Sequence, residues 1–304
     1  MQKKDMQKQN RPVCSRQNLT ATLVAVLVAF GMLLFCLAPT FKSKSYNVVI
    51  LGDSVIANFF NYYGSPSIPE YVERQTGLTV YNGAFGGSGM AVKRTEQSGA
   101  ALTSSWCMAN LAEAICLDAW EGVRASMSYA NHYVETNPQV FSNYEERLKG
   151  LSQIDFDKVD VLILEHGTND YNMGVTVDNP SDPYDKTTFG GALRYSLKLL
   201  QEKYPNLQIV LLTPFYCEIN IDGEYIKCDE KDWGGGILED YVKKEMEIAN
   251  EFGVDLIDGY YGSGINAKTL PTYMPDRLHP SADGVARIGD MISSYLKGNG
   301  YESQ

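Results

Sequence analysis

Five short apolar runs, separated by segments with helical spacing, constrain the fold of this chain more than any other feature. Turn residues bound each run, and several runs are apolar throughout, which is typical of parallel strands that are covered on both faces. Strands that alternate with helices predict a single α/β domain, a three-layer α/β/α sandwich around a mostly parallel sheet of about five strands. The runs lie at 46–51, 78–81, 159–165, 208–213 and 254–257.

Helical patterns fill the segments between these runs. Two of them, at 237–252 and 281–296, predict helices, and Ser281 is a suitable N-terminal cap for the second. A further helix is expected before Tyr204-Pro205, a pair that would end it. Its apolar residues recur at helical spacing, at Phe189, Leu193, Leu197 and Leu200.

The first part of the chain differs from the rest. Residues 1–18 are basic, and 19–38 form an uncharged apolar stretch that is long enough to span a bilayer as a helix. Basic residues before the stretch predict a single-pass anchor with a cytoplasmic N-terminus. A short linker, 39–45, would then hold an extracytoplasmic domain, 46–304, close to the membrane. The alternative is a cleaved signal peptide and a secreted domain, but no clean pair of small residues marks a cleavage site.

Charge argues against one class of partner. The formal net charge of the chain is −11, and the first forty residues are net basic, so the remainder is more acidic still. Nucleic-acid binding needs a basic footprint, which this body lacks. We therefore expect no nucleic-acid partner.

Four cysteines fall in the predicted exterior domain. Cys217 and Cys228 flank an Asp222-Gly223 pair between alternating residues, which is a strong signal for a two-residue hairpin turn. In that register the two cysteines lie directly opposite, and we predict a disulfide between them. Cys107 and Cys116 are nine positions apart, so they pair only if a helix breaks between them, and are otherwise two buried thiols.

A serine stands where open α/β sheets place their ligands. Gly52-Asp53-Ser54 follows the apolar run directly, and a glycine there lets the backbone turn sharply, so the serine is presented at the carboxyl edge of a strand. Three further clusters stand after strands or before the last helix. They are Asn82 to Gly89, His166-Gly167-Thr168-Asn169-Asp170, and Asp276-Arg277-Leu278-His279-Pro280.

Ser54 needs a base before it can act as a nucleophile. The exterior domain has three histidines, and only His279 has an acid three positions earlier in a segment that reads as a loop. There Asp276 would fix the imidazole tautomer and stabilise the imidazolium. The other two histidines, His132 and His166, show no ligand spacing, and the chain has no paired CxxC, so we expect no metal and no cofactor.

The four clusters, in this order, resemble the blocks of the SGNH/GDSL hydrolases. The resemblance covers roughly 46–296 and implies a flavodoxin-like sheet and a serine hydrolase that needs no cofactor. It also implies that Ser54, His279 and Asp276 form a catalytic triad. The oxyanion would be held by the Ser54 N–H, the Gly87 N–H and the side-chain amide of Asn169.

Small departures from the family pattern leave this chemistry intact. Val55 stands where leucine is usual, and Ser88 stands where many members have aspartate. Gly86 is the alternative to Gly87 as the oxyanion donor. Of the neighbouring acids, we expect Asp53 to cap the helix after the nucleophile and Asp170 to order its own loop, and we expect His166 to be structural.

A helical segment at about 103–144 is larger than the scheme needs. Its apolar stripe either packs on the core or partly covers the active site, where Tyr129, His132 and Tyr133 would suit a wall that faces carbohydrate. The stripe consists of Cys116, Trp120, Val123, Met127, Ala130 and Val134.

The function expected from these features is ester hydrolysis. An acidic, tyrosine-rich domain tethered near the bilayer favours O-acetyl esters on envelope or extracellular carbohydrate. The enzymatic alternatives are a lipase or lysophospholipase, for which no basic amphipathic helix is present, and an O-acyltransferase that would use the same triad. The alternative from outside enzymology is a catalytically silent glycan-binding envelope protein.

Overall fold

A five-stranded parallel sheet forms the centre of the domain. The computed structural model describes residues 44–57, 65–92, 104–125, 127, 135–136 and 143–302. The strands run in the order β2–β1–β3–β4–β7, which is the flavodoxin-like order and confirms the fold class expected from the sequence. Their bounds are β1 Val48–Gly52, β2 Val80–Asn82, β3 Val161–Glu165, β4 Gln208–Leu212 and β7 Asp255–Ile257.

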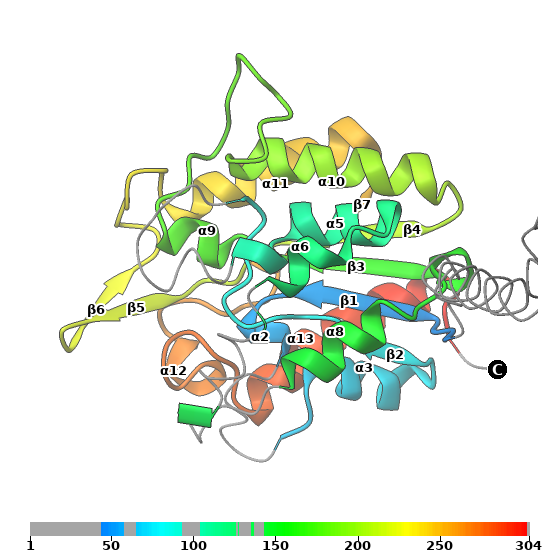
Figure 1. Cartoon of the computed structure of the whole chain (residues 1–304). Helices are drawn as coiled ribbons and strands as arrows, with labels where there is room; N and C mark the ends of the chain where they lie inside the picture. The colour runs from blue at the N-terminus through cyan, green and yellow to red at the C-terminus, as the bar shows by residue number, and fades with distance from the viewer. Residues whose placement is uncertain are drawn as a thin grey trace, which may run out of the picture. The chain divides into compact units, whose positions relative to one another are not determined.

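The burial of the two central strands, β1 and β3, explains why the sequence shows them as apolar runs. Every residue of β1 and β3 is buried, because helices cover both faces of the sheet. The parallel register pairs Gly52 with Glu165, so the two strands end side by side. Whatever follows β1 and β3 therefore meets at one edge of the sheet, which is on the left in Figure 1.

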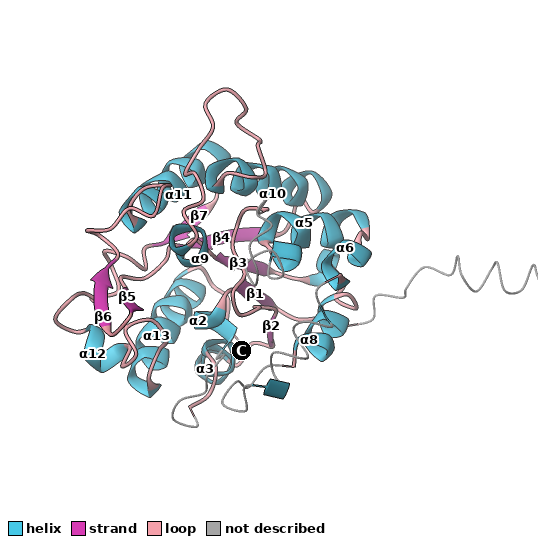
Figure 2. Ribbon diagram, turned by 60° about the vertical axis from the view of Figure 1, so that its left-hand side comes forward, coloured by secondary structure: helices cyan, strands magenta, loops and turns pink. Residues whose placement is uncertain are grey.

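Helices cover both faces, as the two views in Figures 1 and 2 show. On one face α10 packs against α5 and α11, and on the other α3 packs against α13. Their bounds are α3 Ile68–Thr76, α5 Met108–Leu117, α10 Phe189–Lys203, α11 Leu238–Phe252 and α13 Ala282–Gly298. The predicted helices are confirmed, and the Ser281 side chain caps α13 by accepting a hydrogen bond from the Gly284 N–H at 3.2 Å.

The large segment near 103–144 is only partly described. It contains η1 (Ser104–Trp106), α5 and α6 (Trp120–Arg124), and α8 (Tyr144–Leu151) follows it. Three members of the apolar stripe, Cys116, Trp120 and Val123, are buried in the core. That confirms the packing interpretation for these residues. Tyr129, His132 and Tyr133, and with them the expected cover over the active site, lie outside the described residues.

The predicted hairpin is present as β5 (Glu218–Ile221) and β6 (Glu224–Lys227). Asp222 and Gly223 form its turn with φ values of 52° and 92°, as a two-residue turn of this kind requires. Cys228 donates its N–H to the Cys217 carbonyl, so the two cysteines do lie opposite each other.

The predicted disulfide between Cys217 and Cys228 is not found, and both are buried free thiols. The Sγ of Cys228 instead accepts the Cys217 N–H at 3.4 Å, which gives the sulfur a hydrogen-bond partner without a covalent bond. Cys107 and Cys116 are also buried thiols that form no disulfide with each other, because α5 runs unbroken from Met108 and keeps them apart.

Four short elements complete the described chain. They are α2 (Ser54–Ala57), η2 (Phe156–Lys158), α9 (Thr168–Asn172) and α12 (Leu270–Tyr273). No helix of the described residues is long and apolar enough to cross a bilayer. The predicted anchor at 19–38 and the basic segment 1–18 lie outside the described part of the chain.

Candidate active site

Ser54 begins α2 directly beyond the end of β1. A Cβ on Gly52 would lie 2.8 Å from the Ile56 side chain and 3.0 Å from the Glu165 carbonyl oxygen, so only glycine fits where the chain leaves the sheet. The Asp53 carboxylate accepts the Val55 N–H at 2.8 Å and so caps the short helix, as expected from the sequence. This turn presents the serine hydroxyl at the carboxyl edge.

Ser54, His279 and Asp276 form a continuous hydrogen-bonded line. Ser54 Oγ lies 3.0 Å from His279 Nε2, and His279 Nδ1 lies 2.7 Å from Asp276 Oδ2. Since Asp276 only accepts when ionised, His279 carries its proton on Nδ1, and its unprotonated Nε2 can accept from the serine hydroxyl. Ser54 and His279 are 225 positions apart in the sequence, and the fold brings them into contact.

The second carboxylate oxygen of Asp276 orders the loop that carries His279. Asp276 Oδ1 accepts the N–H groups of Leu278 at 2.9 Å and of His279 at 2.6 Å. Burial by itself would raise the pKa of Asp276, but the hydrogen bonds from the His279 ring and from the backbone N–H groups of His279 and Leu278 lower this pKa overall. Asp276 is therefore ionised at neutral pH and suited to stabilise an imidazolium.

Arg277, between these residues, ties the loop to the hairpin. Its φ of 74° is unusual for a residue with a side chain, and its carbonyl accepts the Glu218 N–H at 3.0 Å. Its guanidinium lies 3.5 Å from the Glu218 carboxylate and 5.0 Å from the centre of the Tyr225 ring. This role could not be predicted from the sequence, because the hairpin is far from Arg277 along the chain.

Asn169 joins the serine turn to the glycine-rich loop. Its Nδ2 donates to Asp53 Oδ2 at 3.0 Å and to the Ser88 carbonyl at 2.9 Å. Gly87, next to Ser88, has a φ of 77°, which suits glycine. Asp53 precedes Ser54 in the chain, and Ser88 follows Gly87. The amide of Asn169 therefore bridges the serine turn and the glycine-rich loop.

Two further residues of these clusters have structural positions, as expected. Asp170 accepts the N–H groups of Met90 and Ala91 at 2.7 and 2.9 Å, and so anchors the glycine-rich loop. His166 is fully buried with its Nε2 3.1 Å from Ser88 Oγ. Burial lowers the pKa of His166 to about 3, so the ring is neutral.

Sequence reasoning missed two buried carboxyl groups near this site. Glu165 ends β3 and Glu245 lies on α11, and both are fully buried. Burial, together with the charge of Asp53, raises the pKa of Glu165 well above its usual value, and burial with the charge of Asp170 does so for Glu245. Burial raises the pKa of Asp53 to about 6. The only indication in the sequence was that Glu165 ends an otherwise apolar run, the one that forms β3.

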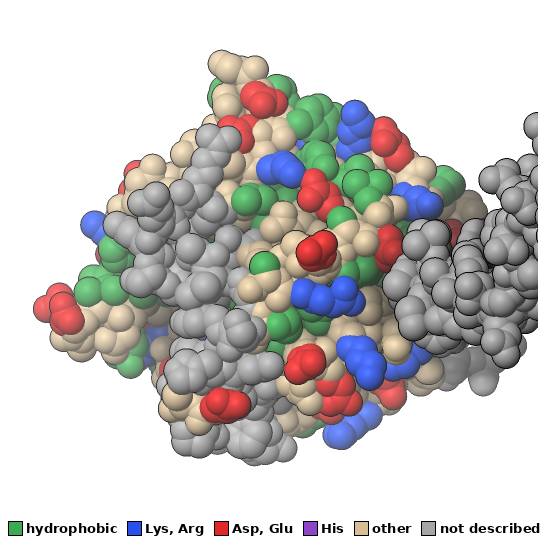
Figure 3. All heavy atoms as spheres, in the orientation of Figure 1, with side chains coloured by type: hydrophobic (Ala, Val, Ile, Leu, Met, Phe, Trp, Pro, Cys, Tyr) green, Lys and Arg blue, Asp and Glu red, His purple; other side chains and the backbone are tan. Residues whose placement is uncertain are grey.

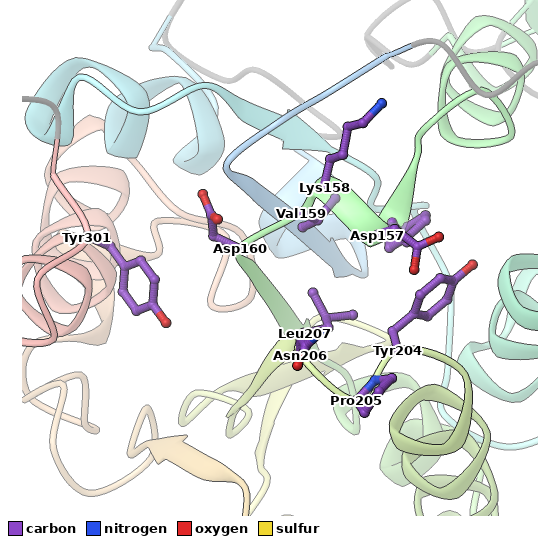
Figure 4. Close-up of a pocket in the computed structure, with 10 residues that line it drawn as sticks. Asp157, Lys158, Val159, Asp160, Tyr204, Pro205, Asn206, Leu207 and Tyr301 are labelled. Carbon is purple, nitrogen blue, oxygen red and sulfur yellow. The ribbon is translucent and has the colours of Figure 1, made fainter.

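The described residues form no metal site, and the pocket at the opposite edge of the sheet lies away from Ser54. Among the described residues, no group of three or more His, Cys, Asp or Glu side chains is positioned to hold a metal ion. A pocket of about 230 Å³, drawn in Figure 4, is lined by Asp160 and Leu207, which precede β3 and β4. It therefore lies at the amino edge, away from Ser54, whereas ligands of such sheets bind at the carboxyl edge.

Solved structures share this fold at low sequence identity. A protein from Lactobacillus plantarum is 18% identical, with a TM-score of 0.56, and the match covers 84% of this chain and 98% of that one. A "possible lipase" from Chitinophaga pinensis is 17% identical, with a TM-score of 0.53 over 84% of this chain and 100% of that one. The salicylyl-acyltransferase SsfX3 is 16% identical, with a TM-score of 0.50 over 86% of this chain and 57% of that one. No curated protein sequence matches significantly.

The described domain is a flavodoxin-like α/β sandwich with a Ser–His–Asp line at its carboxyl edge, an architecture suited to a hydrolytic enzyme. The chain belongs to the GDSL-like lipase/acylhydrolase family, whose model matches residues 95–287. The family makes it a hydrolase of ester bonds. The matched segment contains Asn169, Asp276 and His279 and begins after Ser54 and Gly87, so the geometry above is what connects the serine to the rest of the site.

Proposed function

We propose that this protein is a serine esterase in which Ser54, His279 and Asp276 form the catalytic triad. The observation that carries the proposal is the unbroken line from Ser54 Oγ through the His279 ring to Asp276, with distances of 3.0 and 2.7 Å. An ionised aspartate on Nδ1 and an unprotonated Nε2 that faces a hydroxyl are what general-base activation of a serine needs.

The reaction then runs in two halves. Ser54 Oγ attacks the ester carbonyl while His279 Nε2 takes its proton, and the same proton passes to the leaving alcohol. Water, activated by His279, hydrolyses the acyl-enzyme and releases the acid. Asp276 stays ionised and stabilises the imidazolium in both halves.

The oxyanion of each tetrahedral intermediate would be held by the Ser54 N–H, the Gly87 N–H and the Asn169 amide. Both hydrogens on Asn169 Nδ2 are already donated, to Asp53 and to the Ser88 carbonyl. The oxyanion must therefore share or displace one of these acceptors. Two fixed acceptors also prevent the amide from rotating, so its donor face is preorganised.

For the substrate we propose O-acetyl esters on envelope or extracellular carbohydrate. The support is the acidic body of the chain, which would repel anionic lipid surfaces, and the apolar stretch at 19–38, which we propose anchors the domain outside the cell membrane. Deleting residues 1–41 should move the protein from the membrane pellet to the supernatant. If it stays in the pellet without them, the anchor is wrong.

The reaction is tested with the full chain in detergent, and Ser54→Ala is the variant with which the wild type is compared. The wild type should release acetate from 4-nitrophenyl acetate, and Ser54→Ala should lose at least about 10³-fold in kcat, as expected when a nucleophile is removed. Equal rates for the two proteins would overturn the proposal.

A further inference from the structure

A second pocket lies at the same edge of the sheet as Ser54. It has a volume of about 800 Å³, within the usual range for small-molecule sites. We call it the tyrosine pocket. The residues that matter to the argument are three tyrosines, two carboxylates and a lysine: Tyr216, Tyr260, Tyr261, Asp229, Glu239 and Lys268.

The fold connects this pocket to the proposed triad. Tyr216 follows β4, and Tyr260 follows β7, the neighbouring parallel strand, so both stand beyond the carboxyl ends. Two residues after Tyr216, the Glu218 N–H donates to the carbonyl of Arg277, which adjoins Asp276. The loop that contains Lys268 also leads through α12 directly into the Asp276 loop. Figure 1 shows α12 and the hairpin at this same end of the domain.

The aromatic rings offer both stacking and hydrogen bonding. Tyr261 is 51% exposed, and its ring meets that of Tyr260 edge to face at 5.0 Å. Its hydroxyl donates to Glu239 at 2.7 Å, which fixes the ring. Tyr216 is only 6% exposed, yet its hydroxyl has no hydrogen-bond partner among the described residues. A buried hydroxyl normally has a partner, and a ligand hydroxyl or an ordered water in the pocket would supply it.

The charges narrow the class of ligand. Asp229 and Glu239 outnumber Lys268, so the pocket disfavours phosphate and other anionic head groups. An acyl chain would leave the buried Tyr216 hydroxyl without a partner. A neutral sugar ring carries no negative charge and has hydroxyls that can pair with the polar groups of the pocket. Its C–H face packs on an aromatic ring, and its hydroxyls donate to carboxylates.

We propose that the tyrosine pocket is a carbohydrate-binding subsite that holds a neutral sugar ring of the substrate while its ester lies at Ser54. This inference rests on the proposed esterase function and names the part of the substrate that the protein recognises. Tyr261 provides the exposed stacking face, and the carboxylates Asp229 and Glu239 accept from the sugar hydroxyls.

The test compares full-length Tyr261→Ala, Tyr261→Phe and Tyr184→Ala in detergent. Tyr184 is a matched control, because it is also exposed, at 42%, but lies outside the pocket. The substrates are 4-nitrophenyl acetate, which has no sugar, and acetylated oligomers of glucose, xylose and N-acetylglucosamine. For the best oligomer, Tyr261→Ala should raise KM roughly 10-fold, the loss expected of one aromatic contact. Its rate on 4-nitrophenyl acetate should stay within about two-fold. Tyr261→Phe keeps the ring and should raise KM for the oligomer less than Tyr261→Ala does, and Tyr184→Ala should resemble the wild type.

The outcomes separate the subsite from the reaction. Titration calorimetry measures the binding of the deacetylated oligomers to Ser54→Ala. This measurement reports on the pocket even if no ester is cleaved. If the wild type cleaves no ester but binds an oligomer, and Tyr261→Ala weakens that binding, the esterase proposal is wrong and the subsite proposal stands. The subsite is wrong if no oligomer binds, if Tyr261→Ala affects both substrates equally or neither, or if it selectively impairs hydrolysis of lysophosphatidylcholine.

Discussion

At the scale of single residues, the site depends on which atoms donate and which accept. The Asn169 amide donates twice, to Asp53 and to the Ser88 carbonyl, and this fixes its nitrogen on the side of the serine turn. An aspartate of the same shape would present an acceptor instead and would repel both Asp53 and an oxyanion. Donor character at this position, and not shape, is what the account requires.

Asn169→Ala should lower kcat by about 10²–10³-fold with little change in KM, because the lost donor acts in the transition state. Asn169→Asp should be at least as inactive despite its matched shape. Asn206→Ala, at the amino-edge pocket of Figure 4, serves as the control and should keep wild-type kinetics on 4-nitrophenyl acetate. An active Asn169→Asp variant would remove Asn169 from the oxyanion site.

The residues of the four motifs could be found from the sequence because each stands at a strand end or just before a helix. Glu165 could not be recognised as a buried acid, since its burial depends on how β1, β3 and α11 pack. The tyrosine pocket was equally hidden, because Tyr216 and Tyr260 are brought together by the order of β4 and β7 in the sheet. The disulfide was wrong although the register was right, since opposite positions permit a bond without requiring one.

At the scale of elements, the hairpin β5–β6 braces the loop that carries His279. Arg277 makes three contacts with it, through its carbonyl, its guanidinium and its stacking on Tyr225. The parallel strands were predictable as apolar runs, and the hairpin from its Asp-Gly turn. α12 was missed, because a helix of four residues depends on its packing against α13 and has too few residues to show a period.

Two substitutions at Arg277 separate side-chain bracing from backbone strain. Arg277→Ala and Arg277→Gly both lose the contacts with Glu218 and Tyr225, so kcat should fall by a similar factor of about 3–10 in each. Only glycine suits the φ of 74°, so the glycine variant should be more stable to urea than the alanine variant by about 1 kcal/mol. Equal stability of the two variants would show that φ at this position is free to change.

At the scale of the whole molecule, charged side chains are spread over the surface, and three of the buried acids have raised pKa values. On the face in Figure 3, acidic and basic side chains are interspersed, and the acidic tip of the hairpin projects to the left. Inside, Asp53, Glu165 and Glu245 all have raised pKa values, chiefly because they are buried. A carboxyl whose pKa is higher in the folded state binds more protons when folded. Its contribution to stability is full below the unfolded pKa, near 4, and is lost as the pH rises through the folded pKa.

Glu245→Gln tests this directly, because glutamine keeps the shape and cannot ionise. The free energy of unfolding of the variant, relative to the wild type, should rise by at least about 1 kcal/mol between pH 4.5 and 7.5 in urea titrations. Glu247→Gln on the same helix is the control, since Glu247 is exposed and paired with Lys244, and should show no such slope. If both variants follow the wild type at every pH, Glu245 is not a protonated buried acid.

The most direct measurement is covalent labelling of the full chain with a fluorophosphonate probe, followed by mass spectrometry of its peptides. The triad predicts a single modified residue, Ser54, with labelling abolished in Ser54→Ala and slowed by at least about 10³-fold in His279→Ala. Labelling at another serine, or an unlabelled wild type, would contradict the assignment of Ser54 as an activated nucleophile.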